Sequence, residues 1–346
     1  MSQMPIPGVD PQIQAACDAF RRDYRAVQAE IAKAIVGHTE IVDGVLTCLF
    51  VGGHALLEGV PGLGKTALIR SLSEALNLKF NRIQFTPDLM PADVIGTNVI
   101  MEDEHGHRVF KFIEGPIFSQ IVLADEINRA TPKTQSALLE AMQEHQVTAG
   151  GEIRKLEEPF FVMATQNPLE QEGTYPLPEA QLDRFFFKLQ VQYSDRQELK
   201  AILDRTTTGY KANIQPVLDG QKIMVHQQLI RRVVIAPHVQ DYAIRCVLAT
   251  HPQGQYSVPM VNQFLRVGAS PRAAQAITLA AKVRALLDAR FHVSFQDIKD
   301  VVTPAMRHRL ILNFEGEAEG ITTDMVLEKI IGDIPTTVEA DLAAAR

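Results

Sequence analysis

The eight residues from Gly59 to Thr66 have the types and spacing of a phosphate-binding loop. They read Gly-Val-Pro-Gly-Leu-Gly-Lys-Thr, and glycines let a loop turn its backbone N–H groups toward phosphate oxygens. The apolar run His54–Glu58 before the loop and the helical pattern Thr66–Leu76 after it predict a strand and a helix. The N-terminus of that helix would face the same anion. We therefore expect Lys65 to neutralise the β- and γ-phosphates and Thr66 to ligate Mg²⁺.

Two adjacent carboxylates, Asp125 and Glu126, follow the apolar run Ile121–Ala124. An apolar run that ends in acidic residues predicts a buried strand with carboxylates at its carboxyl end. We expect Asp125 to hold Mg²⁺ through water and Glu126 to polarise the attacking water. The pair comes about 60 residues after the phosphate loop, a separation that fits one nucleotide site. Such a site hydrolyses its nucleotide.

Asn167 follows the next apolar run, Phe160–Thr165. At the end of a neighbouring strand, its amide could orient water between Glu126 and the γ-phosphate. An asparagine in a turn before Pro168 is equally consistent with the spacing.

Two arginines have positions that suggest an anionic partner. Arg184 directly precedes the expected strand Phe185–Val191, and Arg272 lies in the first turn of a helix that begins at Ser270-Pro271. A cation near a helix N-terminus is locally unfavourable, which points to an anion nearby. A surface salt bridge is the plainer explanation for either arginine.

Strands and helices alternate through the first half of the chain, which predicts a parallel sheet covered by helices. Beyond about Ser194 the strand signals fade and helices dominate. We therefore expect an N-terminal helical segment at 1–36, an α/β core at 37–193 and a helical domain at 194–346. Further expected elements are a helix capped by Asp10 and starting at Pro11, a strand at Phe80–Phe85, a helix at Thr131–Gln143, and hairpins at Asn98–Ile113 and Gln146–Lys155.

The composition is that of a soluble globular protein. Of 346 residues, 46% are hydrophobic and 22% charged, and 34 basic against 41 acidic residues give a net charge of −7. An acidic chain is a poor nonspecific duplex binder. The uncharged stretch Gly44–Gly53 is too short to cross a bilayer. The three cysteines have no paired spacing, so we expect a cytoplasmic protein without a transmembrane segment. His105 and His107 are interpreted as turn residues rather than metal ligands.

Four longer strings of the sequence resemble the MoxR family of AAA+ ATPases. These strings are Leu57–Thr66, Asp125–Ala130, Ala137–Glu144 and Leu177–Phe185, and the resemblance covers most of residues 30 to 310. It implies an α/β fold: a P-loop AAA+ core with a parallel sheet between helices, and a smaller all-α lid domain. It also implies an ATPase with ATP and Mg²⁺ as ligands. His38 and Thr131 depart from the family's usual residues, and residues 209–228 match nothing that we can assign.

The resemblance also implies a role for each candidate residue. Asp125 and Glu126 match the Walker B pair, Asn167 matches sensor 1 and Arg272 matches sensor 2. Arg184 matches the arginine finger, which reaches the nucleotide of a neighbouring subunit, although Arg272 or Arg129 could act across the interface instead. The nucleotide contacts that the resemblance implies are Val36, Gly37, Gly59, Val60, Pro61, Gly62, Leu63, Gly64, Lys65, Thr66 and Ala67.

The family's usual activity is the remodelling or chaperone-like activation of a protein client by a ring, here expected to be a hexamer. The resemblance implies a client that works with a von Willebrand factor A-type domain protein. One alternative is a motor subunit of a magnesium-chelatase-like metal-insertion complex. A nucleic-acid translocase is disfavoured because acidic residues balance the basic ones around both expected hairpins. The first has Glu102, Asp103 and Glu104 against Arg108 and Lys111, and the second with the residues after it has Glu152, Glu157 and Glu158 against Arg154 and Lys155. A nucleotide-gated binding protein without turnover is disfavoured because Glu126 and Arg184 are present.

Overall fold

The computed structural model describes residues 11–60, 62–102, 107–168 and 173–336. The chain forms two compact units, and each is discontinuous in sequence. The first, here called the α/β unit, contains Ala26–Phe185 and Leu189–Ile223. The second, here called the helical unit, contains the chain up to Arg25, Phe186–Lys188 and the chain from Met224 onward. The domain ranges 1–36, 37–193 and 194–346 are continuous, and they stay a prediction.

A five-stranded sheet with the order β2-β5-β8-β1-β9 forms the centre of the α/β unit. The pairs β2–β5, β5–β8 and β8–β1 are parallel, which confirms the expected α/β fold. The register places Gln84 beside Asp125 and Glu58 beside Gln166, so these four polar residues end neighbouring strands. The strands are β1 (Ala55–Glu58), β2 (Phe80–Gln84), β5 (Ile121–Asp125), β8 (Phe161–Gln166) and β9 (Phe187–Gln190).

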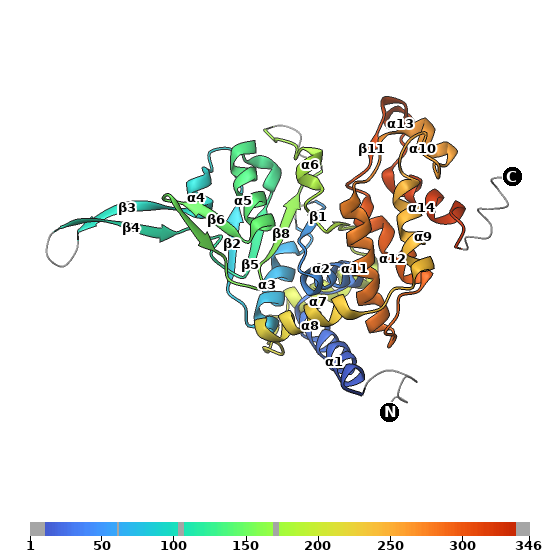
Figure 1. Ribbon diagram of the computed structural model, residues 1–346. Helices are drawn as coiled ribbons and strands as arrows, with labels where there is room; N and C mark the ends of the chain where they lie inside the picture. The colour runs from blue at the N-terminus through green and yellow to red at the C-terminus, as the bar shows by residue number, and fades with distance from the viewer. Residues whose placement is uncertain (1–10, 61, 103–106, 169–172, 337–346) are drawn as a thin grey trace. The chain divides into compact units, whose positions relative to one another are not determined.

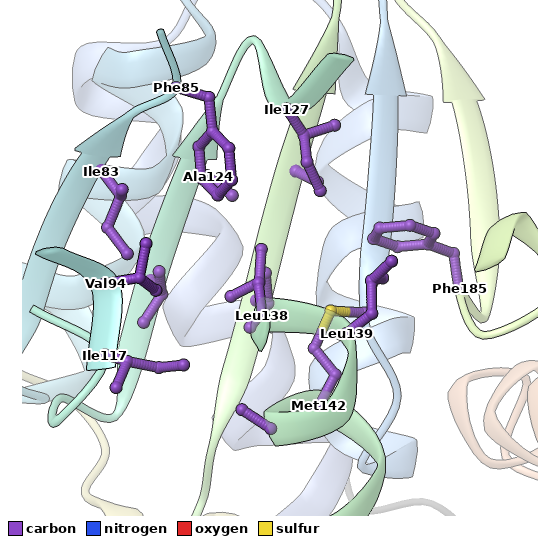
Figure 2. Close-up of a cluster of buried hydrophobic side chains, with 14 of the residues drawn as sticks. Ile83, Phe85, Val94, Ile117, Ala124, Ile127, Leu138, Leu139, Met142 and Phe185 are labelled. Atoms are coloured by element: carbon purple, nitrogen blue, oxygen red, sulfur yellow. The ribbon is translucent and has the colours of Figure 1, made fainter. Parts of the chain in front are cut away.

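An apolar cluster packs helix α5 (Pro132–Glu144) and the short helix α4 (Pro91–Ile95) against the sheet (Figure 2). Leu138, Leu139 and Met142 project from α5 toward strands β5 and β8, and Phe185 closes one side. Burial of each such side chain contributes about 1.5–3 kcal/mol. The cluster therefore fixes the strands whose carboxyl ends carry the polar residues.

Helix α2 (Thr39–Val51) was not expected from the sequence. Nearly all of its residues after the first turn are buried, including Phe50 and the central Gly44. A helix that is apolar on all sides lacks the 3.6-residue alternation by which a half-buried helix is found. The uncharged stretch Gly44–Gly53 is thus the second half of a core helix.

Two β-hairpins interrupt the α/β unit, as expected. Strands β3 (Gly96–Glu102) and β4 (Arg108–Glu114) pair antiparallel, as do β6 (Gln146–Ala149) and β7 (Glu152–Lys155). The β3–β4 hairpin projects away from the sheet (Figure 1). Its expected turn near Gly106 lies outside the described residues.

The first helix, α1 (Pro11–Ala34), begins at the expected proline, whereas the expected cap Asp10 lies outside the described residues. Helix α7 (Arg196–Thr206) holds the other end of α1, because Arg205 Nη1 donates to the carbonyls of Ala32 and Lys33 at 2.9 and 3.1 Å. The segment after α7 follows the α/β unit, where Gln215 N donates to Glu30 Oε2 at 2.9 Å. The Gln215 contact therefore anchors residues 209–219 to α1.

Helices α11 (Pro271–Leu287) and α12 (Phe295–Met306) form the centre of the helical unit. Ser270 caps α11 as expected, since its Oγ accepts from Arg272 N at 3.2 Å. Two short strands, β10 (Leu265–Val267) and β11 (Ile311–Leu312), also pair here. No helix in the described part of the chain is both long and apolar enough to cross a membrane. The remaining elements are α3 (Lys65–Leu76), η1 (Ile127–Arg129), α6 (Glu179–Leu182), α8 (Gly220–Arg232), α9 (Pro237–Leu248), α10 (Pro259–Phe264), α13 (Phe314–Ala318) and α14 (Thr323–Asp333).

Candidate active site

The phosphate loop connects β1 to α3. Two different constraints, backbone conformation and lack of space, favour glycine at positions of this loop. Gly62 and Gly64 have φ values of 86° and 75°, and a Cβ on either would meet no atom within 4 Å. The left-handed backbone, rather than space, therefore favours glycine there. At Gly59 a Cβ would lie 2.9 Å from Cβ of Val191, so lack of space favours glycine. Pro61 lies outside the described residues.

Lys65 is the first residue of α3. Its Nζ donates to the carbonyl oxygen of Gly59 at 2.5 Å, which folds the ammonium back over the loop. Burial lowers the pKa of Lys65, and the carboxylates of Asp125 and Glu126 act in the opposite direction. The ammonium is thus held inside the loop beside both carboxylates. Thr66 follows it, with its side chain exposed in the first turn of the helix.

Asp125 ends β5, and hydrogen bonds hold both of its carboxylate oxygens. Oδ1 accepts from Thr165 Oγ1 at 2.6 Å. Oδ2 accepts from Arg82 Nε at 3.1 Å and from Arg82 Nη2 at 2.7 Å. The side chain of Asp125 is 13% exposed and that of Arg82 is 47% exposed. The carboxylate is therefore fixed by a buried hydroxyl on one side and by a half-exposed cation on the other.

Glu126 directly precedes the 3₁₀ helix η1 and has a left-handed backbone, with a φ of 55°. This conformation is uncommon for glutamate and turns its side chain away from the line of the strand. Its Oε2 accepts from Gln84 Nε2 at 2.8 Å and from Arg129 Nη1 at 3.0 Å. Its backbone N–H donates to Thr165 Oγ1 at 2.8 Å. Two donors thus hold the Glu126 carboxylate through Oε2.

These groups surround one cavity of about 260 Å³. Asn167, which directly follows β8 and is 7% exposed, reaches the same cavity. The lining residues are Gly62, Gly64, Lys65, Thr66, Ala67, Arg82, Gln84, Asp125, Glu126 and Asn167. The structure thus brings together most of the residues that the sequence suggested for phosphate and metal.

Other predicted site residues lie elsewhere. Arg184 is not among the described lining residues, and its Nη1 donates to the carbonyl of Leu139 in α5 at 2.8 Å. Gly37 has a φ of 68° and lies against Glu198 of α7. Arg272 belongs to the helical unit, whose placement relative to the phosphate loop is not defined.

Comparisons with known proteins agree with this geometry. Residues 54–187 match the family model described as the ATPase family associated with various cellular activities (AAA), and residues 259–330 match the AAA lid domain. The chain is 40% identical to Chaperone MoxR1 of Mycobacterium tuberculosis over 87% of this chain and 79% of that protein. It belongs to the MoxR family of AAA+ ATPases. It is also 30% identical to Protein MoxR of Methylorubrum extorquens over 89% of this chain and 95% of that protein.

A solved structure shares the fold of this MoxR-family protein. The crystal structure of a protein from Cytophaga hutchinsonii, assigned as an ATPase, has a TM-score of 0.87 and 40% sequence identity. The match covers 94% of this chain and 98% of that one. Together with the family match, this supports an AAA+ fold and an ATPase.

Three residues of the MoxR-family site were missed by sequence reasoning: Arg82, Gln84 and Thr165. Arg82 and Gln84 alternate with the buried Ile83 on β2, and Thr165 is buried in β8. A polar i, i+2 pair on the expected strand Phe80–Phe85 was a usable signal for the first two. The sequence carried no signal for Thr165, because threonine is common in buried strands.

The oxygen atoms in this MoxR-family cavity fit Mg²⁺. The Thr66 hydroxyl and the Asp125 carboxylate both line it, and hard oxygen donors suit this ion. No group of three or more His, Cys, Asp or Glu residues able to hold a metal occurs among the residues described. Mg²⁺ in nucleotide sites typically takes only one or two protein ligands and completes its shell with phosphates and water.

Proposed function

We propose that this MoxR-family ATPase hydrolyses MgATP at a site completed by a neighbouring subunit of a ring and uses the cycle to remodel a protein client. The observation that carries the proposal is the convergence of Lys65, Thr66, Asp125, Glu126 and Asn167 on one cavity. Each has a distinct part in phosphoryl transfer to water.

Lys65 and the N–H groups of the loop and of the first turn of α3 would bind the phosphates. The Lys65 ammonium would exchange the Gly59 carbonyl for phosphate oxygens, which is favourable because the partner becomes charged. Thr66 and Asp125 would hold Mg²⁺, which supplies charge neutralisation at the β- and γ-phosphates. Val36, Gly37, Val60, Leu63 and Ala67 would complete the nucleotide contacts.

Glu126 would take up the attacking water and polarise it, and Asn167 would orient that water toward the γ-phosphate. Both line the cavity that Lys65 and Thr66 of the phosphate loop also line. Gln84 and Arg129 both donate to the same Oε2 of Glu126. These two donors stabilise the charged carboxylate, so loss of either contact would make Glu126 a better acceptor for the proton of water.

Arg184 would act on the nucleotide of the next subunit. It lies outside its own chain's described cavity lining and is held by the Leu139 carbonyl, a weak neutral partner for a guanidinium. Arg272 would sense the nucleotide from the lid, and Arg129 is the alternative across the interface. A ring, proposed here as a hexamer, is the assembly that repeats such a head-to-tail contact and closes.

The β3–β4 hairpin supports a protein client. Ile100 and Phe110, opposite each other in the register, are 61% and 76% exposed, and exposed apolar residues of this size mark protein contacts. The described charges on the hairpin, Glu102, Arg108, Lys111 and Glu114, balance, which disfavours a track for nucleic acid. A relative named as a chaperone favours remodelling over a magnesium-chelatase-like motor. A von Willebrand factor A-type partner and a cytoplasmic location belong to the same proposal.

Mixing two inactive variants tests the shared site. Arg184→Ala retains Glu126, and Glu126→Gln retains Arg184, so a mixed ring contains some sites with both groups intact. We expect each variant alone to release little phosphate, the mixture to regain activity, and the specific activity of the wild type to rise with protein concentration. Phosphate release is the suitable readout because the chain has no Trp. A mixture as inactive as its components, with wild-type activity independent of concentration, would overturn the shared site and direct attention to Arg129 and Arg272.

A further inference from the structure

Arg82 is the one cation in direct contact with Asp125 among the described residues, and it lies where the divalent cation is proposed to act. Its Nε and Nη2 both donate to Oδ2 of Asp125, at 3.1 and 2.7 Å. The other oxygen, Oδ1, is held by the buried Thr165. Of the two carboxylate oxygens, Oδ2 is therefore the one that can exchange its partner. Its partner in the structure is Arg82.

The contact between Arg82 and Asp125 is weak enough to be exchanged for another partner. The arginine side chain is 47% exposed, against 13% for Asp125, and exposed ion pairs contribute little to stability. A divalent cation at Asp125 would also lie beside the guanidinium, and two positive centres within a few ångströms repel each other. Cation and arginine therefore compete for one oxygen.

The same guanidinium nitrogen is linked to the carboxylate of Glu126 through Gln84. Arg82 Nη2 donates to Gln84 Oε1 at 2.6 Å as well as to Asp125. With its oxygen turned toward Arg82, the Gln84 amide presents Nε2 to Glu126 Oε2 at 2.8 Å. The flipped amide would place its NH₂ group against the guanidinium, so Arg82 determines which way Gln84 faces. Asp125, Arg82, Gln84 and Glu126 thus form one continuous chain of hydrogen bonds.

We propose that Arg82 competes with the divalent cation for Asp125, and that its release also loosens the Gln84 contact that restrains Glu126. Arg82 is then a positioning residue: filling the cation site weakens the Gln84 contact to Oε2 of Glu126 and makes the carboxylate a better acceptor for the proton of water. An ATP molecule without its metal would meet the more restrained Glu126 and would be hydrolysed more slowly. This inference rests on the proposed function, because it assumes that Asp125 holds Mg²⁺.

Mn²⁺ binding tests the competition without using activity. The paramagnetic resonance signal of unbound Mn²⁺ reports how much of the ion is taken up by the ADP-loaded protein. Removal of the competing charge in Arg82→Gln should lower the half-saturating Mn²⁺ concentration about tenfold. Arg82→Lys, which keeps the charge but not the paired donors, should lie between Arg82→Gln and the wild type. Arg70→Gln, which removes an exposed arginine of α3, is the matched control and should match the wild type.

The outcomes separate this inference from the proposed function. Wild-type protein that takes up no Mn²⁺ with ADP would overturn the magnesium part of the proposed function. Normal uptake by the wild type together with an unshifted or weaker Arg82→Gln would overturn the inference alone. Thermal unfolding of each variant shows whether it is folded, and Arg82→Lys tests the competition even if Arg82→Gln is not.

The link to Glu126 has its own test. Gln84→Ala should raise the basal rate of phosphate release at limiting Mg²⁺ and change it little at saturating Mg²⁺, where Arg82 has already left Asp125. In the Arg82→Gln background the same substitution should have no further effect, because the two residues act in one chain. An effect of Gln84→Ala that is equal at all Mg²⁺ concentrations and additive with Arg82→Gln would contradict the link.

Discussion

The Thr165 hydroxyl on β8 donates to Oδ1 of Asp125 on the neighbouring strand β5, at 2.6 Å, and so orients the carboxylate proposed to hold the metal. Thr165 Oγ1 also accepts a hydrogen bond from the backbone N–H of Glu126 at 2.8 Å. One buried hydroxyl thus fixes the positions of both members of the acidic pair. Its removal would leave the Glu126 backbone donor without its partner and the Asp125 carboxylate held by Arg82 alone.

Thr165→Val keeps the shape of the side chain and deletes only this hydroxyl. We expect the free energy of unfolding to fall by about 1–2 kcal/mol, the usual cost of an unsatisfied buried donor. Phosphate release should fall as well, because Asp125 loses its orientation. Urea unfolding and a phosphate assay measure the two effects. Thr165→Ser retains the hydroxyl and is the matched control; equal losses in Ser and Val variants would show that the hydroxyl is not the cause.

Glu126→Gln separates binding of the nucleotide from its hydrolysis. The amide keeps the size of the side chain but cannot accept a proton from water, so we expect phosphate release to fall by about 10²–10⁴. Binding of ATP should persist, because Lys65 and the loop are unchanged. Equilibrium binding of a fluorescent nucleotide and a phosphate assay provide the two readouts. Glu114→Gln, on the exposed end of β4, is the control, and wild-type turnover by Glu126→Gln would remove Glu126 from the mechanism.

The helical unit depends on a buried carboxylate, Asp297, which is 2% exposed. It accepts two hydrogen bonds from Arg290 at 2.7 Å each and caps α12 through the Ser294 N–H, also at 2.7 Å. Burial raises the pKa of Asp297, but the hydrogen bonds from Arg290 and Ser294 outweigh it and leave the pKa below its ordinary value. Its stabilising effect is therefore present above the ordinary pKa of aspartate and is lost as the pH falls through the lowered value.

Asp297→Asn should lower the free energy of unfolding by about 2–3 kcal/mol, because it removes the buried carboxylate charge that accepts two hydrogen bonds from the partly exposed Arg290. Asp300→Asn, a partly exposed position on the same helix, should cost far less. Denaturant unfolding followed by circular dichroism compares the two variants. Equal destabilisation by both would show that Asp297 is an ordinary surface charge.

The parts of the site that the sequence predicted are those whose chemistry lies in contiguous residues. Gly59–Thr66 and Asp125-Glu126 each sit at one strand end, so local pattern was enough to place them. Arg82 and Thr165 come from two further strands, and their contact with Asp125 depends on strand order and register. A sequence without an alignment does not contain that order, and the polar partners of the acidic pair were therefore missed.

The fold shows the same division. Strands flanked by turns and half-buried helices were predicted because their periodicity is visible in the sequence. Helix α2, buried on nearly all sides, has no such periodicity and was missed. Contacts such as that between Arg184 and the Leu139 carbonyl link residues 45 positions apart, and only the packed structure reveals them.

His54 provides a pH-dependent test of the core. Its Nε2 contacts the Met142 carbonyl at 2.9 Å, and its Nδ1 accepts the Val162 N–H at 3.1 Å, so the ring is neutral with the proton on Nε2. Burial, aided by the nearby His145, lowers the pKa of His54 from 6.5 to about 4. Between these two values the unfolded chain binds a proton that the folded chain does not. Stability from this group is therefore complete above pH 6.5 and falls as the pH decreases toward 4.

Comparison of the wild type with His54→Gln isolates this contribution, because glutamine can donate to Met142 and accept from Val162 but does not titrate. We expect the stability of the wild type relative to His54→Gln to fall by about 2 kcal/mol between pH 8 and pH 5. Urea unfolding of both proteins at several pH values measures the difference, in which the titration of all other groups cancels. A difference that stays constant over this range would mean that His54 is protonated as easily in the folded protein as in the unfolded chain.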